Sequence, residues 1–60
     1  MVILKTNRSA YAPEQIEKNT ITVGELIDLL ECENRNEKIV FSNDDGYTYG
    51  YINESVIDNI

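Results

Sequence analysis

The chain contains no histidine and no tryptophan, and it carries a single cysteine, Cys32, and a single proline, Pro13. One cysteine cannot form a disulfide within the chain. A zinc site needs several thiolate or imidazole ligands, and the sequence supplies one such group. Histidine is the side chain that ordinarily titrates near neutral pH, so its absence removes the usual general base. We therefore expect no metal site, no cofactor and no enzymatic activity.

Basic residues are also scarce, since five Lys and Arg residues stand against eleven Asp and Glu residues, for a formal charge of −6. Residues 1–8 hold Lys5 and Arg8 and no acid, whereas residues 39–60 hold four acids and no base. Such a field repels nucleic acid and favours basic protein partners. A charge of this size also serves solubility, because small domains commonly carry a net charge of about 2 to 8.

The length bounds the architecture, because 60 residues form one domain, residues 1–60, at most. A chain this short is expected to bury only about 60% of the surface that it exposes when unfolded. No apolar run is long enough to span a membrane. The opening MVILK has no basic residue before its apolar run, so it does not match a secretory signal. The lack of a secretory signal and of a membrane span, together with the single free cysteine, predicts a cytoplasmic protein without a membrane partner.

Residues 21–33, ITVGELIDLLECE, carry the clearest local pattern. Thr22 and Glu25 are spaced as a capping box, in which each side chain accepts from the other residue's backbone N–H. At helical periodicity the apolar residues fall on one face and the acids on the other. The apolar face comprises Val23, Leu26, Ile27 and Leu30, and the acidic face comprises Glu25, Asp28 and Glu31. The segment is predicted to form an amphipathic helix, with Cys32 on its polar side and partly exposed.

The segments KIVFSN (38–43) and YTYGYI (47–52) read as a β-hairpin around a turn. A two-residue loop would place the tyrosines beside Val40 and Ser42. A three-residue loop with a bulge at Gly46 would place Tyr47 beside Asn43 and align the apolar residues of both strands on one face. We favour the three-residue loop because it separates apolar from polar side chains better. It predicts that Tyr49 and Tyr51 lie mostly in the core and that Tyr47 is the most exposed of the three.

Together these segments predict an α+β fold. Residues 1–6 and the hairpin form a small antiparallel or mixed sheet, with the amphipathic helix packed on one face. Whether the first strand pairs beside the hairpin's first or second strand stays open. Pro13 and the residues after it allow one short helical turn. The tail NESVIDNI (53–60) forms either a short helix capped by Asn53 or a further strand, and its apolar residues are expected to dock.

The stretch SNDDG (42–46) is rich in the oxygen-bearing side chains that bind calcium, but it lacks the ligand positions of a calcium-binding loop. Aligned on Gly46, a calcium-binding loop of the EF-hand type would need oxygen ligands at Phe41 and Ile52, which have none to offer. A chain of this length is also not expected to form a cleft of ordinary ligand volume. The aspartates are therefore interpreted as turn formers and as surface charge.

The segments TVGELIDLL and KIVFSNDDGYTYGYI resemble the helix-then-hairpin core of small uncharacterised proteins of bacteria and their phages. The resemblance covers about residues 22–52 and implies a compact α+β fold without a catalytic motif. In size, acidity and lack of catalytic groups, the chain is also similar in style to phage-encoded inhibitors of host defence, including anti-CRISPR proteins. Many of those bind a nuclease or its nucleic-acid channel.

These observations predict a non-enzymatic acidic binding protein that acts on a basic protein partner, such as a nuclease or effector that binds nucleic acid. No direct contact with nucleic acid is expected. The candidate contact residues are Glu25, Asp28, Glu31, Asp44, Asp45 and Tyr47. The alternative is a small structural module that forms homodimers through its sheet, with the charge serving solubility alone.

Overall fold

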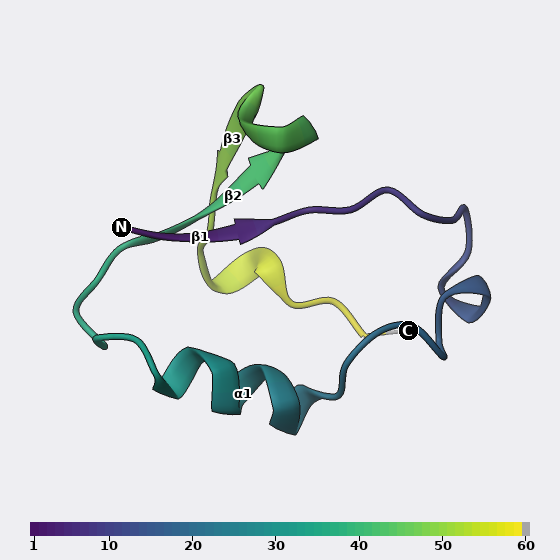
Figure 1. Ribbon diagram of the computed structural model, residues 1–60, viewed down its shortest axis with the longest axis horizontal. Helices are drawn as coiled ribbons and strands as arrows, with labels where there is room; N and C mark the ends of the chain where they lie inside the picture. The colour runs from purple at the N-terminus through teal and green to yellow at the C-terminus, as the bar shows by residue number, and fades with distance from the viewer. Residues whose placement is uncertain (60) are drawn as a thin grey trace.

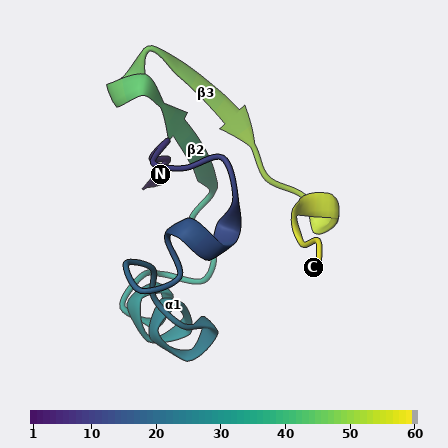
Figure 2. The same cartoon turned by 90° about the vertical axis from the view of Figure 1, so that its right-hand side faces the viewer.

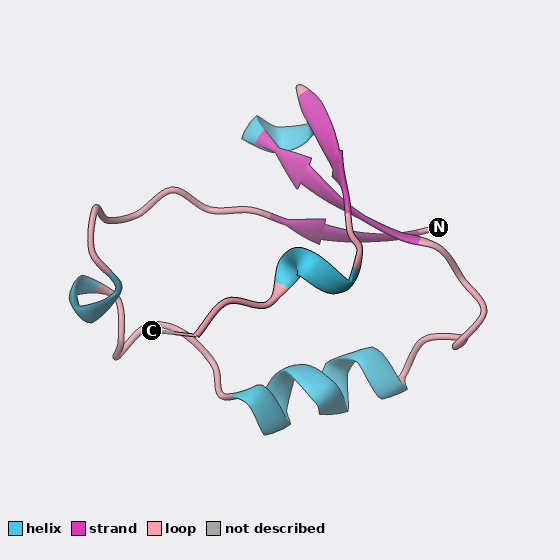
Figure 3. Cartoon of the chain, turned by 180° about the vertical axis from the view of Figure 1, so that it is seen from behind, coloured by secondary structure: helices cyan, strands magenta, loops and turns pink. Residues whose placement is uncertain are grey.

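The computed structural model describes residues 1–59, which contain three strands, one α-helix and three short 3-10 helices (Figure 1). The strands are β1 (Val2–Lys5), β2 (Ile39–Asn43) and β3 (Thr48–Tyr51), and the α-helix is α1 (Val23–Glu31). The 3-10 helices are η1 (Pro13–Gln15), η2 (Asp44–Gly46) and η3 (Glu54–Val56). Figure 3 shows the sheet and α1 as two separate layers joined by loops. The small α+β fold predicted from the sequence is confirmed.

The sheet is mixed and has the order β1-β2-β3. Strand β1 pairs in parallel with β2, so that Val2 lies opposite Ile39, and β2 pairs antiparallel with β3. The open question about the first strand is thereby answered, since it lies beside the first strand of the hairpin. Parallel neighbours require a long crossover connection. Residues 6–38 provide it and carry α1 away from the sheet (Figure 1).

The turn of the hairpin differs from the favoured prediction. Thr48 pairs with Asn43 and Tyr49 with Ser42, which is the register of the two-residue alternative, while four residues form the connection. Asp44 and Asp45 have positive φ values of 49° and 56°, as does Gly46 at 92°. Aspartate tolerates this left-handed region better than most residues. Because the backbone N–H of Tyr47 closes the turn on the Asn43 carbonyl at 3.0 Å, Tyr47 belongs to the turn and not to β3.

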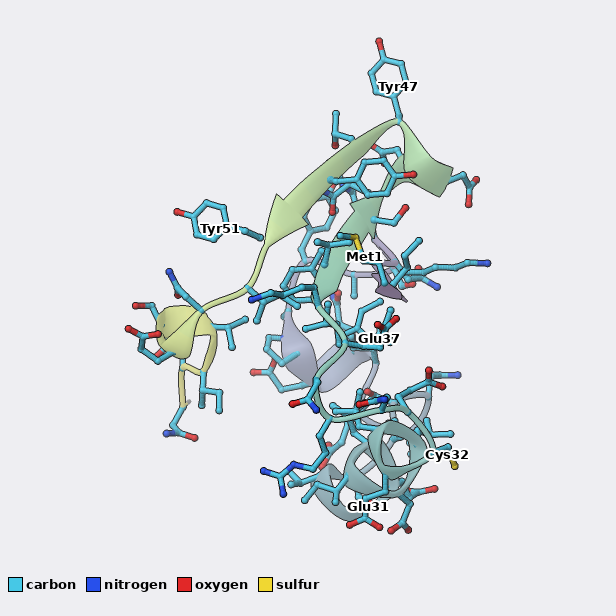
Figure 4. All side chains as sticks on the ribbon, turned by 90° about the vertical axis from the view of Figure 1, so that its left-hand side faces the viewer. Met1, Glu31, Cys32, Glu37, Tyr47 and Tyr51 are labelled. Atoms are coloured by element: carbon cyan, nitrogen blue, oxygen red, sulfur yellow. The ribbon has the colours of Figure 1, made fainter. Side chains whose placement is uncertain are left out.

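The register decides which face of the sheet carries the tyrosines. Tyr49 and Tyr51 share a face with Ser42 and Val40, and this tyrosine face is turned away from α1. The prediction that Tyr49 and Tyr51 are core residues is wrong, because their exposed fractions are 61% and 83%. Tyr47 is the most exposed of the three at 85%, as predicted. Figure 4 shows Tyr47 and Tyr51 pointing away from the rest of the chain.

Helix α1 begins as the capping box predicts. The Glu25 N–H donates to Thr22 Oγ1 at 3.1 Å, and the Thr22 N–H donates to Glu25 Oε1 at 3.1 Å. The helix runs beside the other face of the sheet, to which Val2 and Ile39 belong, but it packs little against that face, because no residue of α1 is buried. The close helix packing expected from the apolar stripe is therefore absent.

The short helices agree with the sequence in part. Helix η1 begins at Pro13, and Asn53 caps η3 by accepting from the Ser55 N–H at 2.9 Å. The tail does not dock as expected, since Val56 and Ile57 are exposed, while Ile60 lies outside the described residues. In Figure 2, η3 lies to one side of both the sheet and α1. The polar and acidic residues that surround these two apolar side chains give the tail little reason to collapse.

The chain is open for its size. A compact folded protein of 6.9 kDa exposes about 4,000 Å² of surface, whereas this structure exposes 6048 Å². Its radius of gyration is 12.7 Å, compared with about 10 Å for a compact chain of this length. Among residues 1–59 no apolar side chain is buried, and Ser42 is the one buried polar residue. About 2,000 Å² of surface that a compact fold would cover is therefore left uncovered.

Candidate functional site

The three acids predicted on the helix lie on α1 as expected, but they have different roles. The carboxylate of Glu25 is engaged in the capping box and also accepts from the Thr22 hydroxyl at 3.0 Å. Asp28 and Glu31 are exposed, and within the described part of the chain neither carboxylate forms an ion pair. Asp28 and Glu31, and not Glu25, are thus the helix carboxylates that are available to a cation.

The other three predicted residues lie around the hairpin turn. Asp44 pairs with Arg8 at 3.7 Å, and both side chains are largely exposed. An exposed pair of this kind contributes little stability and is open to exchange with another cation. Asp45, Tyr49 and Lys5 border a hollow of about 340 Å³ on the tyrosine face, and Tyr47 is exposed. Within residues 1–59 Asp45 forms no ion pair, although Lys5 borders the same hollow.

The structure does not bring the six predicted residues together. The turn and α1 lie at opposite ends of the molecule, as Figure 1 shows, and in Figure 4 the labelled Tyr47 and Glu31 mark these two ends. They are separated along the vertical axis of Figure 1, along which the chain measures 28 Å. The candidate residues form two negative clusters, one on the helix and one at the turn, and not a single site.

A groove lies between α1 and the sheet, with a volume of about 550 Å³. We call it the α1 groove. Its apolar walls are Ile27 and Leu30 from the helix and Val2 and Ile39 from the sheet, and its rim carries Glu31, Glu33, Asn34, Arg35 and Glu37. Ligand pockets commonly measure about 300 to 1,000 Å³, so the expectation that this chain forms no cleft of ordinary size is wrong. The cleft exists because the helix and the sheet have not closed on each other.

One rim residue of the groove is already paired. The α-ammonium group of Met1 donates to Glu37 Oε1 at 2.8 Å (Figure 4). This hydrogen bond, together with the attraction of the positive charge, lowers the pKa of Glu37. The pair ties the start of β1 to the loop before β2, next to the bond from the Val2 N–H to the Lys38 carbonyl at 2.8 Å. Glu31 and Glu33 are the rim acids that remain free of any ion pair within residues 1–59.

Cys32 ends α1 between these two acids and is exposed, as predicted. Its thiol lies 3.6 Å from the Asp28 carbonyl oxygen, to which it donates a weak hydrogen bond. Figure 4 shows its sulfur at the outside of the helix. The side chain therefore offers a unique attachment point for a probe close to the acidic rim.

No three His, Cys, Asp or Glu side chains within residues 1–59 are grouped so that they could hold a metal ion. None of the helices in the same range is both long and apolar enough to cross a bilayer.

The fold and its surface define a small, open α+β protein whose charged groups are mainly exposed carboxylates and whose apolar groove is uncovered. Comparison of the chain with protein-family models, with curated proteins and with solved structures finds no match. The sequence predicted the helix acids and the apolar stripe, but it did not predict the groove. The one signal for the groove is the apolar stripe, and the stripe does not show whether the sheet covers it.

Proposed function

We propose that this protein is a non-enzymatic, acidic binding protein that acts on a basic protein partner. The observation that carries the proposal is the pair of exposed helix carboxylates, Asp28 and Glu31, which lack a cationic partner within residues 1–59 of a chain with a net charge of −6. Uncompensated surface charge of one sign steers partners of the opposite sign. Asp45 adds a second negative point at the far end of the molecule.

Proteins that bind nucleic acid present basic surfaces, so we place the partner among them. The protein would then act in the cytoplasm as an inhibitor of a host nuclease or effector, in the manner of phage-encoded anti-CRISPR proteins. Charge density limits the mechanism. A duplex as long as the 34 Å axis of this chain carries about 20 phosphate charges, against a net −6 here. Inhibition would therefore come from protein contacts at the basic surface and not from close mimicry of a duplex.

Charge reversal tests the proposal. In the variant Asp28→Lys, Glu31→Lys, Asp45→Lys, both negative clusters lose their free carboxylates, while Glu25 is kept because it caps α1. The control variant Glu14→Lys, Glu17→Lys, Asp58→Lys makes the same change in net charge elsewhere. In a capture experiment from host lysate, the wild type and the control should retain one basic partner at low salt and release it at high salt. Equal capture by the cluster variant would refute the proposal.

The exposed tyrosine face supports a second candidate, a structural module that assembles through its sheet. Tyr49, Tyr51 and Ile3 are all exposed on this face, and β1 and β3 form the two edges of the described sheet. Unpaired strand edges and exposed aromatic side chains both favour association. Sedimentation that shows a monomer at high micromolar concentration would count against this candidate, whereas a stable dimer would leave the charge to serve solubility.

A further inference from the structure

The α1 groove is an apolar feature that the open fold leaves uncovered. Ile27 and Leu30 from the helix face Val2 and Ile39 from the sheet across it, and Leu30 is still 36% exposed. A standard protein interface covers about 800 Å² on each partner. The excess exposure of about 2,000 Å² is spread over the whole chain, so the groove supplies one part of such an interface and the surfaces beside it supply the rest.

Charge decides among the possible occupants. The rim holds three acids and one cation, Arg35; Met1 pairs with Glu37, and Glu31 and Glu33 form no ion pair within residues 1–59. The chain's own tail carries Glu54 and Asp58 with no basic residue, so the rim repels it. A second copy brings a further net charge of −6. The groove is therefore complementary to an occupant that is both apolar and cationic.

The walls of the groove also favour one backbone conformation. One wall is the flank of a helix and the other is the face of a sheet, so neither offers a row of unpaired backbone groups. An extended peptide would leave its own N–H and C=O groups unpaired there, whereas a helix satisfies them internally. Amphipathic helices bind in apolar grooves through side chains spaced three and four residues apart.

We propose that the α1 groove binds a cationic amphipathic helix of the partner protein. The apolar side chains of that helix contact Ile27, Leu30 and Ile39, and its Lys or Arg residues lie against Glu31 and Glu33. This inference rests on the proposed function and locates its main contact in the groove, where Glu31 lies on the rim, and not at Asp28, which lies outside the groove. Binding would supply the layer that the free chain lacks between α1 and the sheet.

Three peptides serve as probes in the test. The first is a peptide of about 14 residues, or about four helical turns, made of Leu and Lys in amphipathic helical order. The second has the same composition in scrambled order, and the third is a lysine homopeptide. Affinities for the full-length chain are measured by fluorescence anisotropy of the labelled peptides at low and high salt. The amphipathic peptide should bind at least about tenfold more tightly than the scrambled one, because only it presents a continuous apolar face.

Matched variants place the contact. Leu30→Ser should weaken binding of the amphipathic peptide by about tenfold, whereas Val23→Ser, on the same helix at a residue that is 79% exposed and outside the groove, should leave it within about twofold. Glu31→Gln with Glu33→Gln should weaken it by about two- to fivefold at low salt and less at high salt. Leu30 and Val23 are both exposed in the free chain, at 36% and 79%. The circular dichroism spectra of Leu30→Ser and Val23→Ser should therefore match that of the wild type.

The outcomes separate the two proposals. If the scrambled and lysine peptides bind as tightly as the amphipathic one and Leu30→Ser has no effect, the groove inference is overturned and the acidic-surface proposal stands. If Asp28→Lys abolishes binding while Leu30→Ser does not, the contact lies at Asp28, outside the groove, and the inference again fails. If no cationic peptide binds the wild type, both proposals fail.

Discussion

Replacing Thr22 by alanine removes the hydroxyl that accepts from the Glu25 N–H at 3.1 Å and the donor to Glu25 Oε1 at 3.0 Å. Loss of such a cap costs about 1 kcal/mol, which is about a fivefold shift from helix to coil. Helix α1 has nine residues and no buried side chain. Isolated helices shorter than about 12 residues are marginal in water. The cap is therefore expected to decide how much of α1 is formed in the free chain.

Amide hydrogen exchange measures this effect residue by residue. The Leu26 amide, which donates to the Thr22 carbonyl at 3.1 Å, should lose about fivefold in protection in Thr22→Ala. The Thr6 amide, which donates to the Ser42 carbonyl at 2.9 Å, should keep its protection, because α1 packs little against the sheet. Thr22→Ser retains a hydroxyl and should restore protection, and Thr20→Ala serves as the control for the loss of a nearby threonine side chain. An equal loss of protection at Leu26 and Thr6 would contradict this prediction, because it would show that the helix and the sheet unfold as one unit.

The remaining predictions concern the Met1 pair and the hairpin turn. The lowered pKa of Glu37 means that the pair stabilises the fold at neutral pH, where the carboxyl is ionised, and that this contribution is lost as the pH falls through the lowered pKa. Glu37→Gln should therefore abolish the pH dependence of Val2 amide protection in the acid range, and an unchanged profile would contradict this role. Gly46→Ala places a Cβ 3.3 Å from the Tyr49 hydroxyl at a φ of 92° and should destabilise the hairpin by about 1 kcal/mol or more in denaturant unfolding. Gly50→Ala is the matched control, since its Cβ meets only an ordinary contact of 3.8 Å with Phe41 Cβ, and a similar loss in both variants would argue against strain at the turn.

Features set by neighbouring residues could be predicted from the sequence. The capping box of Thr22 and Glu25 depends on two residues three positions apart, and the structure confirms both of its bonds. The cap of η3 by Asn53 is equally local. The register of the hairpin could not be predicted in this way. The prediction reserved the left-handed conformation for Gly46, whereas Asp44 and Asp45 adopt it as well and draw Tyr47 into the turn.

Features set by distant parts of the chain escaped prediction. The apolar stripe of α1 was read correctly, but whether the sheet covers it depends on the path of residues 6–38 and not on the stripe itself. The candidate acids were chosen by residue type, and the fold then separated Asp28 and Glu31 from Asp45 by placing the helix and the turn at opposite ends (Figure 1). The α1 groove results from the same open arrangement of helix and sheet, so no local sequence pattern predicted it.

A cationic partner that occupies the α1 groove should perturb the residues that line it. Mapping amide chemical-shift changes on the isotope-labelled chain during titration with the amphipathic Leu–Lys peptide tests it most directly. The largest changes are expected at Ile27, Leu30 and Ile39, which line the groove. Changes confined to Asp28 and to the turn around Asp45, with the groove residues unmoved, would contradict it.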